Sequence, residues 1–282
     1  MKAKFVEDKI VDVLMVIATA IVFLFFASIL YTIGKTGFHA LSWEMITSLP
    51  GGGFYLGKEG GILNAIVGSL MIVGGATILG LIISIPIVFY MNVYLRKGSR
   101  VAYFTRLSFD VLFGVPSIVY GAFAFTLMIF FGLKTSLLGG IIVITMLIIP
   151  IFVRSMDEVA VSVPHELLEA TYSLGATKLE TCKVVLRQIA PGVATATLLS
   201  IGRAIGDAAG VLFTAGFTDD IPTALNEPAA TLPLSVFFQL SSPIPEVRER
   251  AYAAALLLAI IVLVLSLTGR LITHRFSKNQ IK

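Results

Sequence analysis

Charged residues and thiols are scarce in this chain of 282 residues. Asp, Glu, Lys and Arg make up 13% of it, about half the ~25% of an ordinary soluble domain, whereas hydrophobic residues reach 57%. The mean hydropathy is +0.94. This composition excludes a soluble globular protein. The single cysteine, Cys182, excludes an internal disulfide.

The residues that enzymes need are also few. The chain has three histidines, on segments too far apart to share a metal, and no second thiol to help them. Gly34, Lys35 and Thr36 look like the end of a phosphate-binding loop, but that motif requires glycine where Ile29 stands. We therefore expect no catalytic residue, no metal site and no cofactor bound by this chain.

Six long apolar runs account for most of the sequence. About 20 apolar residues in a helix cross a hydrocarbon layer of about 30 Å. The runs cover residues 10–33, 62–95, 109–131, 136–153, 189–217 and 251–272. They predict an all-α, polytopic membrane protein with six transmembrane helices, forming one domain over residues 1–282.

Three of the runs carry further expectations. The first is too long for a cleavable signal peptide and predicts a retained helix. In the second, residues 62–69 are expected to lie obliquely or outside the hydrocarbon, and Pro86 to bend the remainder. In the fourth, Pro150 need not break the helix, because neighbouring helices can satisfy the freed carbonyl.

The basic residues predict the orientation in a cell membrane. Fifteen of the 21 fall on the side of the two termini, five fall on the other side, and Arg203 lies inside a run. Because cytoplasmic loops are rich in Lys and Arg, both termini and the loop 154–188 are expected in the cytoplasm. The net charge of +4 is thus explained by the membrane topology, and nothing indicates a nucleic-acid partner.

The outer segment 218–250 contains five prolines, which exclude one long helix. Two interpretations stay open for it. It is either a solvated connector or a segment whose apolar part, 232–240, packs on the bundle.

The loop 154–188 has the pattern of two short helices. Pro164 is placed where a helix starts and Gly175 where one stops, with apolar residues at helical spacing between them. A second short helix is predicted over Lys178–Leu186. Such a pair forms a compact projection on the cytoplasmic side or, alternatively, a hairpin lying on lipid headgroups.

Within this loop, Glu169, Ala170 and Gly175 fit the EAA-x-x-x-G motif, with Thr171 in place of the second alanine. The segment resembles the binding-protein-dependent ABC importer permeases. That resemblance implies a type I permease fold and a coupling helix that docks on a cytoplasmic ATPase dimer, which uses the ATP. The family's later proline would fall at Gln188, so the end of the motif departs from the pattern.

Two further stretches, Asp110–Gly121 and Gly202–Gly216, are similar to the phosphate importer permeases. This resemblance implies one half of a translocation path, completed by a homologous second permease subunit and supplied by an extracytoplasmic phosphate-binding protein. A permease for sulfate or molybdate, or an ion-coupled secondary transporter, remains an alternative.

The fifth run contains candidates for the substrate path. Gly202, Gly206 and Gly210 recur every four residues and predict a smooth face for helix packing. Arg203 and Asp207 are also four apart and hence neighbours on a helix. In the phosphate permeases the matching positions are an arginine and usually a glutamate.

Charges at membrane depth are costly and normally serve a function. A guanidinium can hold an oxyanion through two parallel hydrogen bonds. We expect Arg203 to contact the permeating anion and Asp207 to modulate that contact. The alternative is that the two side chains merely neutralise each other and pin two helices together.

The third run contains Pro116 and Ser117, which predict a polar notch on the substrate path. Alternatively, Pro116 only kinks the helix and Ser117 bonds to its own backbone. Asp110 is expected to cap the N-terminus of that helix or to pair with Arg106.

Overall fold

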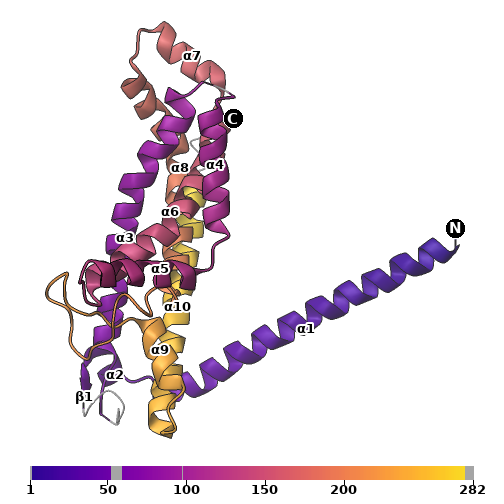
Figure 1. Cartoon of the computed structure of the whole chain (residues 1–282). Helices are drawn as coiled ribbons and strands as arrows, with labels where there is room; N and C mark the ends of the chain where they lie inside the picture. Colours follow the sequence, from indigo (N-terminus) through magenta and orange to yellow (C-terminus); the bar gives the residue numbers. More distant parts are fainter. Residues whose placement is uncertain (1, 52–58, 97, 277–282) are drawn as a thin grey trace.

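Helices build nearly all of the structure, a computed structural model that describes residues 2–51, 59–96 and 98–276 (Figure 1). The predicted all-α class is confirmed, and β1 and β2 form only a two-residue antiparallel pair. In chain order the elements are α1 (Lys2–Ala40), α2 (Trp43–Thr47), β1 (Pro50–Gly51), β2 (Glu59–Gly60), α3 (Leu63–Phe89), the π-helix η1 (Tyr90–Tyr94), α4 (Arg100–Phe113), α5 (Ser117–Phe130), α6 (Leu137–Val161), α7 (His165–Ser173), α8 (Lys178–Ile205), α9 (Leu232–Leu240) and α10 (Pro245–Phe276).

Among the described residues, five helical segments are long and apolar enough to cross a membrane: α1, α3 with η1, α6, α8 and α10. The pair α4 and α5 makes a sixth candidate only as a broken span, because the two helices are bent by 98°. In Figure 1, α3, α6, α8 and α10 form a bundle with α7 at one end, and α1 extends away from the opposite end.

The third predicted span, 109–131, was wrong as a single helix. Helix α4 already begins at Arg100, and it ends at Phe113 with Gly114 as its C-cap. Helix α5 begins at Ser117, directly after Pro116. Proline lacks an N–H and disfavours helical backbone in the residue before it, so the chain turns here.

The fifth predicted span, 189–217, was wrong at both ends. Helix α8 starts at Lys178, where Thr177 and Glu180 form a capping box, and it ends at Ile205. The predicted short helix Lys178–Leu186 is therefore only the first part of α8. Residues 206–217 are not helical.

The loop predicted over 154–188 is shorter than expected, because α6 continues to Val161 and Pro150 does not break it. Its central helix is confirmed: Pro164 precedes α7, and Gly175, with φ +81°, follows it. No residue of α7 is fully buried, and only Leu167, Leu168 and Thr171 are partly covered, so most of the surface of this helix is open to a partner.

The outer segment packs on the bundle. Leu232 and Leu234 of α9 are fully buried, and Phe238 makes an edge-on contact with Phe217. The backbone N–H of Leu232 donates to Ser69 of α3, at 2.9 Å. Of the two interpretations, the packed segment is therefore the one observed.

The segment 62–69 belongs to this same contact. From Leu63 onward it is part of one continuous helix, α3, and Asn64 and Ser69 are buried. The Asn64 amide donates to the carbonyl of Thr218, at 2.6 Å. At the other end of α3, Pro86 is followed by the widened turns of η1.

Close packing of α3 gives a test of this arrangement. A Cβ on Gly68 would overlap the carbonyl oxygen of Ala230, whereas a Cβ on Gly74 meets nothing within 4 Å. We expect Gly68→Ala to destabilise the protein by about 1–3 kcal/mol, because backbone must move. Gly74→Ala in the same helix should leave stability unchanged or slightly higher, because alanine favours helix.

Thermal unfolding of the detergent-purified protein measures both variants. Equal midpoints for the two would contradict the contact between α3 and the segment before α9.

Candidate functional site

The C-terminal end of α8 carries a paired arginine and aspartate. Arg203 Nη1 donates to Asp207 Oδ1, at 2.9 Å. Asp207 lies in the turn after the helix, and its other oxygen, Oδ2, accepts the backbone N–H of Gly210, at 2.7 Å. The Asp207 side chain is 3% exposed and that of Arg203 is 47% exposed. The pair therefore has one buried member and one half-open member.

This asymmetry leaves donors available on the arginine. A guanidinium has five N–H donors. Within the part of the chain that the structure describes, the Arg203 side chain makes one hydrogen bond, to Asp207. Both oxygens of Asp207, in contrast, are engaged. The arrangement can thus bind an oxyanion at the open side of Arg203 while the carboxylate stays fixed.

The turn that holds Asp207 runs back into the bundle. Val211 and Ala215 are buried, and the backbone N–H of Ser136 donates to the carbonyl of Thr214, at 2.9 Å. A Cβ on Gly121 of α5 would lie 2.7 Å from the Gly210 carbonyl oxygen, so the two backbones touch. Non-helical backbone inside a membrane protein is tolerated where protein buries it or a water-filled path adjoins it.

Helix α5 begins beside the same turn. A Cβ on Gly210 would lie 3.7 Å from the carbonyl oxygen of Ser117, the first residue of α5. The N-terminal N–H groups of a helix favour anions. The structure therefore brings Ser117 close to the Asp207 turn, although a right-angled break separates it from α4.

The predicted glycine face does not exist. Of the three glycines, Gly202 alone lies inside α8. Gly206 caps the helix, and Gly210 lies beyond it. Nothing lies within 4 Å of a Cβ on Gly202, and a Cβ on Gly206 would meet only the Gly202 carbonyl. Gly210 instead makes room for Asp207, whose Oδ2 would be 2.7 Å from a Cβ there. The three glycines therefore do not form one helix face, because the helix ends at Ile205, but Gly210 does lie against another backbone, at Gly121 of α5.

A second charged cluster was missed by the sequence analysis. Arg106 of α4 donates from Nε and Nη2 to the two carboxylate oxygens of Asp157 in α6, at 2.7 and 3.0 Å. Asn92 of η1 donates to the same carboxylate, at 2.7 Å. The Asp157 side chain is 12% exposed. Three elements are thus joined through one bidentate ion pair whose carboxylate is buried.

Asp110 does neither of the things expected of it. It lies near the C-terminal end of α4 and pairs with Arg154 of α6, on the surface. Two ion pairs therefore join α4 to α6. In one pair the arginine lies on α4, and in the other it lies on α6. The spacings four apart in α4 and three apart in α6 could have revealed them, had 154–161 been recognised as helix.

The residues of the EAA-like motif lie just before the N-terminal end of α8, at the opposite end of this helix from Arg203. Glu169 and Ala170 are exposed on α7, and His165 Nδ1 lies 3.0 Å from Glu169 Oε1. Gly175 forms the turn between α7 and α8. Helix α8 then runs about 38 Å from Lys178 to Arg203, at ~1.5 Å per residue. One continuous helix, with Pro191 inside it, therefore connects the motif with the charged pair.

No group of three or more potential metal ligands occurs among the described residues. The candidate site therefore consists of Arg203, Asp207 and the first turn of α5.

The two ion pairs between α4 and α6 should differ in importance. Asp157→Ala removes the buried carboxylate that accepts hydrogen bonds from Arg106 and Asn92, and we expect a loss of about 1–3 kcal/mol in unfolding free energy. Asp110→Ala removes a pair whose side chains are both about half exposed, worth at most about 1 kcal/mol. Thermal unfolding compares them, and a larger loss from Asp110→Ala would refute the assignment.

Comparison with known proteins points to one family. The profile described as "Binding-protein-dependent transport system inner membrane component" matches residues 84–281. The phosphate transport system permease protein PstA of Haemophilus influenzae is 34% identical over 86% of this chain and 85% of its own length. PstA of Pasteurella multocida is 34% identical over 89% and 88%, and PstA 1 of Mycobacterium tuberculosis is 35% identical over 76% and 70%.

Among solved structures, the inward-facing MetNI methionine ABC transporter has a chain that superposes with a TM-score of 0.62. The match covers 76% of this chain and 95% of that one, at 19% identity, and so concerns the fold. The helices, the fold and the sequence agreement lead to one conclusion: this multi-pass membrane protein belongs to the family of binding-protein-dependent transport system inner membrane components and, within it, is a relative of the PstA permeases.

Proposed function

We propose that this chain is the permease subunit of an ATP-driven phosphate importer and forms half of its translocation path. The observation that carries the proposal is the agreement with phosphate permeases over most of the chain, at 34–35% identity in the three relatives named above. An ion-coupled secondary transporter is not favoured, because the family consists of binding-protein-dependent components.

In this proposal Arg203 binds the permeating phosphate and Asp207 limits how tightly. A transport site must bind its ion well enough to admit it and weakly enough to release it. Asp207 occupies one donor of Arg203, and the open side of the guanidinium is available to the anion. Asp207 then competes with phosphate for the arginine and repels a dianion.

Ser117 adds a second contact on the same path. Its place at the N-terminus of α5, beside the Asp207 turn, supports this role, because N–H groups there favour negative charge. Within the described residues its hydroxyl donates no hydrogen bond back to its own helix, unlike Thr126 of the same helix.

The end of the molecule that carries α7 faces the cytoplasm in this proposal, together with both termini. It holds the basic side of the chain, as the positive-inside rule requires. Glu169, Ala170 and Gly175 would then contact a separate ATPase dimer that supplies the ATP. A homologous second permease completes the path, and an extracytoplasmic phosphate-binding protein delivers the substrate.

The test of the function is transport by the assembled importer. The chain is reconstituted in liposomes with candidate permease, ATPase and binding-protein subunits, and ATP-dependent uptake of phosphate, sulfate and molybdate is measured. Phosphate uptake that requires ATP supports the proposal. Uptake of sulfate or molybdate in place of phosphate would show that the substrate is a different oxyanion. Uptake without the ATPase would contradict the importer hypothesis.

Removing the charge at Arg203 should strongly lower phosphate transport. We expect Arg203→Gln to lower uptake at least about tenfold, because a charge-assisted hydrogen bond contributes about 1.5–3 kcal/mol. Arg203→Lys keeps the positive charge but lacks the planar guanidinium, so its uptake rate should lie between those of the wild type and Arg203→Gln. Lys134→Gln, in the turn before α6, is the matched loss of one positive charge and should transport normally.

Assembly of each variant with the ATPase is measured in parallel by co-purification. If Arg203→Gln assembled normally and transported phosphate at the wild-type rate, Arg203 would have no role in the path.

Reversing the charge on α7 should uncouple the ATPase. Glu169 is 68% exposed on this helix, so Glu169→Lys alters the docking surface without disturbing a core. We expect co-purification with the ATPase to fall at least several-fold. Glu44→Lys, on exposed α2 at the other end of the bundle, is the control. Equal retention of the ATPase by both variants would argue against α7 as the docking helix.

A further inference from the structure

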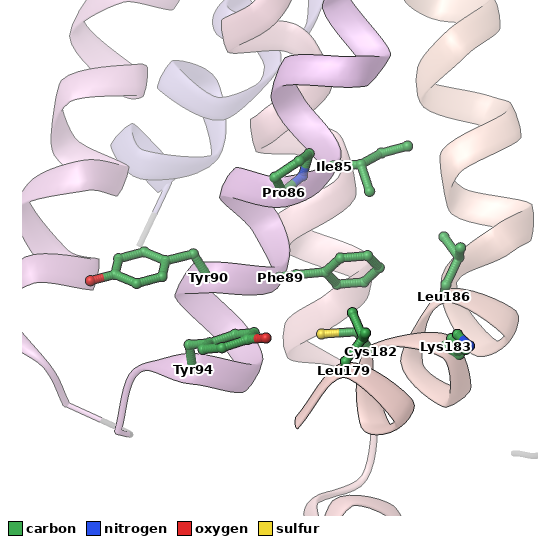
Figure 2. A pocket seen from close by; sticks show the side chains of 9 residues that line it. All are labelled: Ile85, Pro86, Phe89, Tyr90, Tyr94, Leu179, Cys182, Lys183 and Leu186. Atoms are coloured by element: carbon green, nitrogen blue, oxygen red, sulfur yellow. The ribbon is translucent and has the colours of Figure 1, made fainter. Parts of the chain in front are cut away.

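An apolar groove lies at the α7 end of the bundle, away from Arg203 (Figure 2). The last turns of α3 and η1 form one wall, and the first turns of α8 form the other. Its volume is 460 Å³, within the roughly 300–1,000 Å³ of small-ligand pockets. In Figure 2 the ring of Phe89 points toward α8, and the sulfur of Cys182 points back toward α3.

The groove presents apolar surface that the described chain does not cover. Leu179 is 64% exposed, Tyr90 50% and Tyr94 43%. Tyr90 and Tyr94 belong to η1, which follows Pro86. The groove is therefore open to an occupant from outside the described chain. Its occupant must be mostly apolar, because only one charged residue lines the groove.

That residue is Lys183, which is exposed at the edge of the groove. A second ammonium lies nearby, since Lys178 Nζ is 5.2 Å from the centre of the Tyr94 ring. The neighbouring carboxylate, Glu180, accepts hydrogen bonds from Thr177 in the capping box and also interacts electrostatically with Lys183. The groove therefore combines an apolar interior with a rim that carries two ammonium groups and one carboxylate.

A ligand that matches both parts has a hydrocarbon chain and an anionic head. We propose that the groove binds an acyl chain of an anionic phospholipid, with its phosphate held by Lys183 and Lys178. Tyrosines such as Tyr90 and Tyr94 are typical of the level where headgroups meet hydrocarbon, and lysines reach toward that level. The site is separate from the transport path and does not depend on which anion is carried.

Photocrosslinking on the assembled importer tests the site. The importer is placed in phosphatidylcholine vesicles that contain a trace of phosphatidylglycerol or of phosphatidylcholine with a diazirine in the acyl chain. Peptide mass spectrometry then maps the crosslinks. We expect the phosphatidylglycerol probe to label the segments 85–94 and 179–186 at least about fivefold more, the effect of roughly one interfacial lysine. Ile78 and Ile82, on the open face of α3, should be labelled equally by both probes.

Three variants separate the headgroup contact from the acyl-chain contact. Lys183→Gln should lower phosphatidylglycerol labelling toward that of phosphatidylcholine, and Lys183→Arg should preserve it. Leu186→Trp fills the groove and should lower labelling by both probes there, but not at Ile78. Equal labelling of the groove by both probes in the wild type would overturn the proposal. Labelling of Ile78 and Ile82 without labelling of the groove would also overturn it and would indicate that a protein subunit covers the groove.

Discussion

Backbone polar groups cannot remain unpaired inside a membrane protein, and this chain interrupts helices at two places within its bundle. At the first, Tyr120 Oη donates to the carbonyl of Leu112 across the break between α4 and α5, at 2.8 Å. At the second, the Asp207 carboxylate accepts the N–H of Gly210, and Ser136 donates to Thr214. At each interruption, a side chain or a neighbouring segment supplies a hydrogen-bond partner in place of one that the helix would have given.

The candidate site follows from the second interruption. Asp207 holds the turn through both of its carboxylate oxygens, which accept hydrogen bonds from Arg203 and from the N–H of Gly210, and its side chain is 3% exposed. Arg203 balances this charge with one hydrogen bond and keeps the rest of its guanidinium open. The ion pair at the C-terminal end of α8 is therefore also one that can bind an oxyanion. Because α8 is continuous from the α7 turn to Arg203, a movement at the motif reaches the pair through one element.

Local signals in the sequence predicted much of the fold. The apolar runs identified five continuous spans, and Pro164 and Gly175 bounded α7 because their backbone preferences act within one turn. The interruption after Ile205 could not be predicted in this way. Spacing alone made Gly202, Gly206 and Gly210 a packing face, whereas Asp207 bonds to Gly210 and ends the helix.

The ion pair of Arg106 with Asp157 was missed for a related reason. Asp157 was assigned to a loop because the apolar run stops at 153, yet α6 continues in polar residues to Val161. The contact joins residues 51 apart in sequence, and only the packing of α4 on α6 brings them together. Arg203 and Asp207 were predictable because they are four residues apart, even though the second lies just outside the helix.

The central claim is that Arg203 and Asp207 act as one unit on a permeating phosphate. A double-mutant cycle on ATP-dependent phosphate uptake tests it most directly, with Arg203→Gln, Asp207→Asn and the double variant in the reconstituted importer. If Asp207 acts only through Arg203, the double variant transports no worse than Arg203→Gln alone. Losses that multiply, each residue contributing independently of the other, would contradict the account.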